Sequence, residues 1–296
     1  MSNEKPSNYY VPAQSIWPIV GAIGLFLFAF GAASYIQDST GKFGGGNGLG
    51  FITFFAALIV LTIMMVGWWR DVIKESMDNL YSHQMDRSFR QGMMWFISSE
   101  VMFFAAFFGA LFYARNLVVP WLGGEGTHAM THTVLWPEFI PDWPLLTTPA
   151  GETTQSMGPW GLPLINTVIL LTSSVTLTIA HHAIKDQNRM KLIGFTGITA
   201  LLGIIFLGFQ VYEYIHAYRD LGLTMGSGIY GSTFFLLTGF HGAHVTIGTI
   251  MLITMTIRCL KGHFTADNHF AYEATAWYWH FVDVVWVFLF IFVYWL

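Results

Sequence analysis

Seven runs of mostly apolar residues limit the folds open to this chain. Each run is about 20 residues long, the length at which a helix crosses the roughly 30 Å hydrocarbon core of a bilayer. Only 10% of the 296 residues are charged, against about 25% in an average soluble domain. We therefore predict an all-α integral membrane protein with seven transmembrane helices. The runs cover residues 16–36, 50–69, 92–114, 161–184, 192–217, 229–257 and 272–295.

Several classes of function are disfavoured by composition. The single Cys259 excludes a disulfide framework and any zinc or iron–sulfur site built from several cysteines. No basic patch suggests nucleic acid, and the glycines at 44–48 lack the Lys-Ser/Thr that follows a phosphate-binding loop. The first 15 residues are polar and the run beginning at Ile16 has full spanning length. We expect no cleaved signal peptide.

The basic residues predict the orientation of the chain. Cytoplasmic segments of membrane proteins carry an excess of Lys and Arg. An N-terminus inside places ten of the 13 basic residues on the inner side, so we predict a cytoplasmic N-terminus and a periplasmic C-terminus. The ten are Lys5, Arg70, Lys74, Arg87, Arg90, Lys185, Arg189, Lys191, Arg258 and Lys261, and the outer three are Lys42, Arg115 and Arg219.

The connections between the runs differ in kind. Residues 37–49 form a Gly-rich connector, and residues 70–91 are charged, compatible with a helix and able to lie along the membrane surface. Residues 115–160 contain six prolines and four tryptophans, typical of an irregular cap at the outer interface. No internal repeat is visible, which argues against a secondary transporter.

The last run combines apolar length with a polar face. At 100° per residue, Glu273, Trp277, His280 and Asp283 fall within an arc of about 120°. A charged group at the bilayer centre costs roughly 2.5–3.5 kcal/mol on insertion scales. We therefore expect this helix to pack inside the protein, with its polar face turned away from lipid.

Interior histidines and carboxyls are the candidates for chemistry. His241 and His244, spaced i, i+3, can face the same metal, but such a site needs further ligands at matching depth. Hydrogen-bonded interior histidines are the favoured interpretation. Glu100 lies well inside its run. Its carboxyl is either a hydrogen-bonded packing group or a proton-responsive group, and the sequence favours the two interpretations about equally. Glu213 carries a weaker form of the same argument, and there a structural role is favoured.

Basic and aromatic residues leave two runs on the inner side. Arg70 and Lys74 follow Trp68-Trp69, and Arg258 and Lys261 end the sixth run. Such groups suit lipid phosphates, and ordinary snorkelling anchors are an equally good explanation.

Motifs from about residue 17 to the C-terminus occur in the order seen in one family. They are Trp17-Pro18, WWRDVIKES at 68–76, SEVMFF at 99–104, PLINT at 163–167 with AHH at 180–182, GSTFF at 231–235 with GFHGAHV at 239–245, and EATAWYWHFVDVVW at 273–286. This series resembles subunit III of the haem–copper cytochrome c oxidases, of the bacterial aa3 type. The long loop 115–160 and the 37–49 connector depart from the compact mitochondrial pattern.

The resemblance implies a single subunit III domain over residues 1–296. Its parts are a two-helix bundle (1–69), an inner connector (70–91) and a five-helix bundle (92–296), with a lipid-filled V-shaped cleft between the bundles. Haem and copper are expected in partner subunits I and II, and this chain is expected to have no catalytic, cofactor-binding or metal site. The histidines implied to be structural are His181, His182, His241, His244 and His280.

Specific residues carry the remaining implications of the resemblance. Glu100 matches the family's carbodiimide-reactive buried carboxyl. The positions matching lipid head-group contacts are Arg70, Lys74, Glu75, Arg258 and His263. A structural polar network is expected from Glu213, His241, His244, Glu273, His280 and Asp283.

The implied function is a non-catalytic subunit of a proton-pumping terminal oxidase that passes electrons from cytochrome c to O₂. Its roles would be to stabilise subunit I, bind phospholipid, support proton uptake and assist O₂ access in a bacterial inner membrane. Two alternatives stay open on the residues alone. The histidine count suggests a membrane di-iron oxygenase or desaturase, and the interior carboxyls suggest a transporter or channel.

Overall fold

A computed structural model describes residues 10–40 and 48–296 of the chain. Within these ranges the fold is helical, with one isolated antiparallel β-bridge between Thr147 and Thr153. Lys5, Lys42 and most of the Gly-rich connector lie outside the described residues. The longer helices are α1 (Trp17–Thr40), α2 (Leu49–Met77), α3 (His83–Tyr113), α5 (Leu162–Lys185), α6 (Arg189–Arg219), α7 (Ile229–Leu260) and α8 (Phe270–Leu289), and α4 (Val119–Leu122) is a single short turn.

Seven helical segments of the described ranges are long and apolar enough to cross a membrane. This confirms the prediction of an all-α, multi-pass membrane protein. Short π-helical segments extend two of the spans, Ala114–Val118 after α3 and Phe290–Trp295 after α8. The loop 115–160 holds a 3₁₀ turn at Gly126–His128 and a π turn at Thr131–Leu135.

The charged segment 70–91 belongs mainly to two long helices. Residues 70–77 continue α2, and α3 begins at His83. The turn between them contains Asn79 at φ 55°, a left-handed conformation that Asn tolerates better than most residues. The segment therefore consists of the end of α2, a short turn and the start of α3, and it is not a separate element along the surface.

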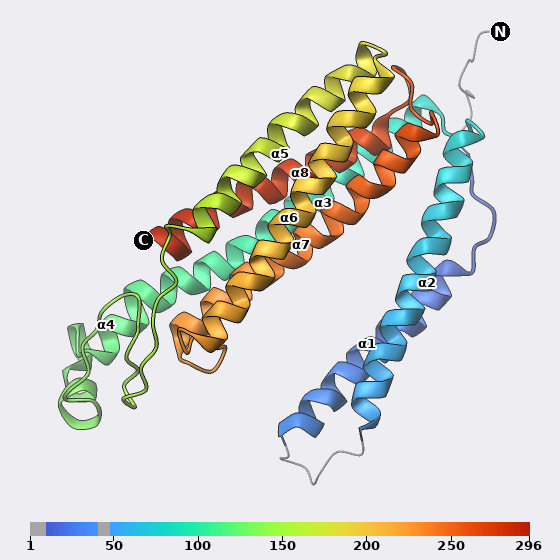
Figure 1. The fold of residues 1–296 in the computed structure, drawn as a ribbon. Coiled ribbons are helices and arrows are strands. Elements are labelled where there is room, and N and C mark those ends of the chain that lie inside the picture. Colours follow the sequence, from blue (N-terminus) through green and yellow to red (C-terminus); the bar gives the residue numbers. More distant parts are fainter. Residues whose placement is uncertain (1–9, 41–47) are drawn as a thin grey trace. The chain divides into compact units, whose positions relative to one another are not determined.

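The chain divides into two compact units between Phe89 and Arg90. In the first unit, α1 and α2 form a closely packed pair (Figure 1). A Cβ atom on Gly31 would lie 2.5 Å from the backbone nitrogen of Phe54, and one on Gly50 would overlap the backbone of Tyr35. Glycine at both positions lets the two backbones approach, which is how membrane helices gain packing contacts without a hydrophobic driving force between them.

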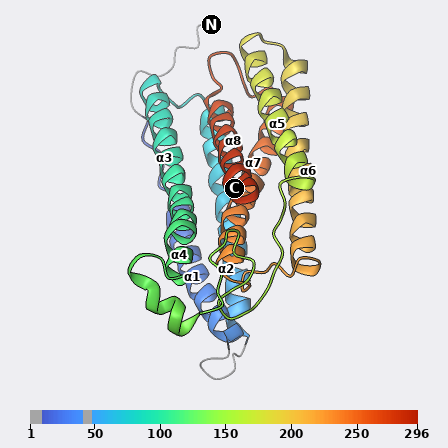
Figure 2. The same ribbon diagram turned by 90° about the vertical axis from the view of Figure 1, so that its left-hand side faces the viewer.

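The second unit is built around α8. In the most apolar window of α8, 61% of the residues are buried, against 39% or less in every other span. Helix α8 packs against α5 and α7, and α6 lies between α5 and α7 (Figures 1 and 2). The prediction that the last helix packs inside the protein is thus confirmed.

Two tryptophans of α8 reach across to α5. The indole Nε1 of Trp279 donates to Ser173 Oγ at 2.8 Å, and that of Trp286 donates to Thr167 Oγ1 at 3.0 Å. Both tryptophan side chains are fully buried. The Trp279 ring also fits against two helices at glycines, because a Cβ atom on Gly203 or Gly248 would lie 2.8 Å from it.

Candidate functional site

Glu100 and His244 form a side-chain pair between α3 and α7. Glu100 Oε2 lies 2.8 Å from His244 Nε2, and the two side chains are 21% and 14% exposed. Phe104 stacks edge-on against the imidazole, with ring centroids 5.0 Å apart, and Tyr278 stacks on it at 6.4 Å. The carboxyl is thus mostly covered by protein, and its partner is a titratable group.

The backbone decides how protons are shared in this pair. His244 Nδ1 lies 2.6 Å from the carbonyl oxygen of Phe240. A carbonyl only accepts, so Nδ1 carries a proton and Nε2 faces the carboxyl. One proton then occupies the Nε2···Oε2 contact, either as imidazolium with carboxylate or as neutral imidazole accepting from a carboxylic acid. The carboxyl and the imidazole therefore share one proton in this contact.

The other polar residues predicted as one network make separate local contacts. His280 Nδ1 lies 2.8 Å from Ser174 Oγ and 3.8 Å from Asp283 Oδ2. The buried His241 places Nε2 3.2 Å from the carbonyl oxygen of Val282. These contacts join α8 to α5 and α7, as expected of groups that tie a bundle together.

Glu213 and Glu273 each have a partner that the sequence did not suggest. The Tyr294 hydroxyl donates to Glu213 Oε1 at 2.6 Å, and this glutamate is fully buried. Arg90 Nη1 donates to Glu273 Oε2 at 2.7 Å across 183 positions of sequence. Tyr294 and Arg90 look like ordinary interface residues in the sequence, so no local signal identifies them as partners.

Among the predicted lipid contacts of the first unit, Arg70 and Lys74 are exposed at the end of α2. Glu75 instead accepts from the Tyr81 hydroxyl at 2.8 Å. Burial raises the pKa of Tyr81, and the hydrogen bond to Glu75 raises it further. Tyr81 therefore stays a neutral donor, and it ties Glu75 to the turn between α2 and α3.

The predicted lipid contacts of the second unit lie where α7 ends. Arg258 is only 6% exposed, and its guanidinium lies 4.6 Å from the centre of the Phe264 ring. Desolvation lowers the pKa of the nearby His263, and the charges of Arg258 and Lys261 add to this effect. A snorkelling anchor would extend its charge into water, so the buried Arg258 is not a simple anchor.

One group of neighbouring side chains was not predicted from the sequence. His181, His269 and Glu273 each offer a ligand atom, and these atoms lie within 4.8 Å of one another. His181 lies in the fourth apolar run and His269 lies between the sixth and seventh, 88 positions apart (269 − 181). Only the i, i+4 spacing of His269 and Glu273 hinted that two of the three share a face.

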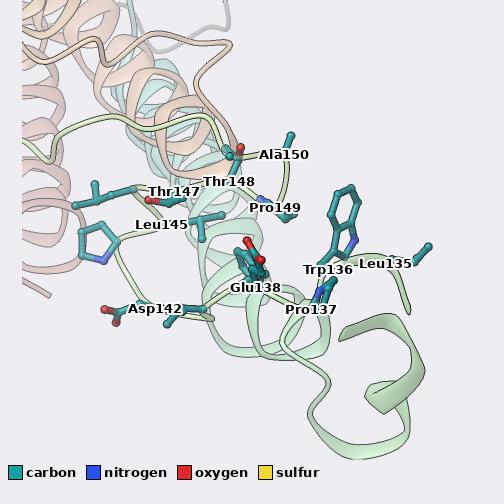
Figure 3. Close-up of a pocket in the computed structure, with 15 residues that line it drawn as sticks. Leu135, Trp136, Pro137, Glu138, Asp142, Leu145, Thr147, Thr148, Pro149 and Ala150 are labelled. Atoms are coloured by element: carbon teal, nitrogen blue, oxygen red, sulfur yellow. The ribbon is translucent and has the colours of Figure 1, made fainter. Parts of the chain in front are cut away.

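The long loop predicted as an outer cap lines a pocket of about 720 Å³. Figure 3 shows Glu138 and Asp142 among the residues around it. Residues 135–151 supply all of its lining. None of the residues predicted to be functional is among them.

Comparisons with known proteins agree with the fold. Residues 7–296 match the family described as Cytochrome c oxidase subunit III. A protein of Mammuthus primigenius named Cytochrome c oxidase subunit 3 is 38% identical over 288 residues, which cover 97% of this chain and 96% of that one. One of the same name from Marchantia polymorpha is 40% identical over 300 residues, covering 100% and 98%. This chain belongs to the cytochrome c oxidase subunit III family.

Proposed function

We propose that this chain is the non-catalytic core subunit III of a proton-pumping terminal oxidase, which passes electrons from cytochrome c to O₂. The observation that carries the proposal is the family match, which runs through all seven spans. In the proposed complex, subunits I and II hold haem and copper, and this chain stabilises subunit I. Phospholipid is the bound group proposed for this chain.

The surroundings of the mid-membrane histidines support a structural role for them. His241 contacts a backbone carbonyl oxygen, His280 contacts a serine hydroxyl, and His244 uses both ring nitrogens on protein groups. Ring nitrogens with such partners orient helices through directional hydrogen bonds. These contacts favour the oxidase subunit over the di-iron oxygenase suggested by the histidine count.

We infer that the inner ends of both units bind phospholipid head groups. Arg70 and Lys74 supply exposed positive charge on the first unit, where an anionic phosphate has access. On the second unit, the mostly buried Arg258 supplies its charge from beneath the Phe264 ring, and the half-buried His263 supplies a donor at the end of α7. We propose that these lipids assist O₂ access, in a bacterial inner membrane with the N-terminus inside.

The test of the proposed function is purification of the chain from its membrane in mild detergent, through a tag on its C-terminus. We expect haem-containing subunits to co-purify in a fixed ratio, and the isolated chain to carry no haem after separation. Optical spectra and metal analysis of both fractions provide the measurement. Haem or stoichiometric iron that stays on this chain, or its recovery without partners, would contradict the proposal.

We propose that Glu100 is protonated and supports proton uptake with His244. Replacing Glu100 with Gln is expected to remove one carboxylic C=O band from the infrared spectrum of the complex. Because Gln keeps a hydrogen-bond partner for His244, the stability cost is expected to be about 1 kcal/mol or less.

Glu213→Gln is the matched control for this measurement. It removes another interior carboxyl, which contacts Tyr294, and should leave the Glu100 band in place. A spectrum that is unchanged in Glu100→Gln would show that Glu100 is not the protonated acid.

A further inference from the structure

We propose that His181, His269 and Glu273 form a binding site for a divalent transition-metal ion of the zinc type. The site lies in the second unit, at the end where α5 finishes and α8 begins (Figure 1). It is separate from the Glu100–His244 pair and goes beyond the role proposed for the oxidase subunit.

The geometry of the three side chains carries this inference. Their candidate ligand atoms lie within 4.8 Å of one another, and each residue is half-buried. The imidazole centroids of His181 and His269 are 5.8 Å apart. A tetrahedral zinc ion with bonds near 2.0–2.2 Å holds its ligand atoms roughly 3.3–3.6 Å apart. The widest separation therefore has to shorten by no more than about 1.2–1.5 Å to complete the site.

A buried polar atom points to the need for a ligand here. The Nε2 atom of His181 is buried and has no hydrogen-bond partner among the described residues. A buried nitrogen without a partner loses the hydration that it has in the unfolded chain, which is unfavourable. Coordination of a metal ion by this nitrogen would remove that cost.

The surroundings orient the other two groups for coordination. His269 Nδ1 lies 3.1 Å from the carbonyl oxygen of Thr265. Since the carbonyl accepts, Nδ1 carries the proton and Nε2 keeps a lone pair for a metal. Glu273 accepts from Arg90 through Oε2, and its second oxygen offers further lone pairs. Such hydrogen bonds behind the ligands are the usual support of zinc sites.

The donor set decides the class of ion. Two imidazoles and one carboxylate suit zinc and similar transition metals, whereas magnesium and calcium prefer oxygen ligands throughout. Three protein ligands leave a fourth position for water. Binding would link the end of α5 to the first turn of α8, so the ion would clamp two helices of the bundle together.

The experiment uses the complex purified through this chain, stripped with a chelator and then dialysed against Zn²⁺. We expect the wild-type complex to bind one more tight zinc ion than the variant His269→Gln. The zinc affinity of the variant at this site should fall about tenfold or more, because loss of a hydrogen-bond partner behind a ligand already lowers metal affinity 10–100-fold. Excess Mg²⁺ should not displace the ion. Since oxygen consumption is not measured, the result does not depend on the oxidase role.

His182→Gln is the matched control, because it removes the neighbouring histidine of α5. His182 is exposed and directs Nδ1 to the carbonyl oxygen of Thr178, so zinc binding should be unchanged. Equal binding by wild type and His269→Gln, or loss in His182→Gln, would overturn the proposal. If His269→Gln does not assemble, anomalous diffraction at the zinc edge from the wild-type complex decides. A peak between the three side chains supports the site, and none at saturating zinc refutes it.

Discussion

Replacing Trp279 with Ala is expected to destabilise the second unit by about 3–5 kcal/mol, the range for a large buried aromatic residue. The side chain is fully buried and fills the space left by Gly203 on α6 and Gly248 on α7. Its loss leaves a cavity between three helices and removes the indole N–H that donates to Ser173 Oγ. Because α5, α6 and α7 all meet this ring, a smaller side chain weakens several interfaces at once.

Thermal unfolding of the complex in lipid nanodiscs, followed by tryptophan fluorescence, measures the effect of Trp279→Ala. Trp95→Ala is the control, because Trp95 is 71% exposed and its removal creates no internal cavity. We expect a clear drop in the midpoint for Trp279→Ala and little change for Trp95→Ala. Equal midpoints for the two variants would show that Trp279 does not organise the bundle.

Replacing Gly50 with Leu is expected to disrupt the α1–α2 pair. A Cβ atom at this position overlaps the backbone of Tyr35 and lies 2.6 Å from the Ser34 carbonyl carbon. Backbone atoms cannot rotate away as a side chain does, so the helices must separate. Overpacking of this kind costs about 1–3 kcal/mol, occasionally more, and separation also forfeits the close contacts at Gly31.

Protease cleavage of the α1–α2 segment in the intact complex measures this effect, together with the amount of complex recovered. Gly109→Leu serves as the control, since a Cβ atom on Gly109 in α3 meets nothing within 4 Å. We expect faster cleavage and lower recovery for Gly50→Leu only. A Gly50→Leu chain that resists the protease like wild type would mean that the α1–α2 pair accommodates the larger side chain without separating.

The sequence alone predicted the number of spans, the central position of the last helix and the family. These depend on properties of short segments. The length of an apolar run can be compared directly with the thickness of the bilayer. A polar arc on an otherwise apolar helix indicates that this arc faces protein. The motifs reported the family in the same way, because each is a short ordered string.

Several other features were decided only by the tertiary structure. Glu100 meets His244 across 144 positions, and Arg90 meets Glu273 across 183. Helical periodicity says that an interior carboxyl needs a partner, but it carries no information on which distant helix supplies one. The same limit explains why the contacts expected as one network are separate pairs.

The burial of Arg258 and the grouping of three side chains at the helix ends could not be predicted from the sequence either. Arg258 resembled a snorkelling anchor, and its cover by Phe264 depends on how the chain turns after α7. His181, His269 and Glu273 come together because the end of α5 and the start of α8 lie at the same end of the bundle. Apolar length and periodicity are properties of one segment and can be read from it, whereas partners arise from the packing of helices far apart in the chain.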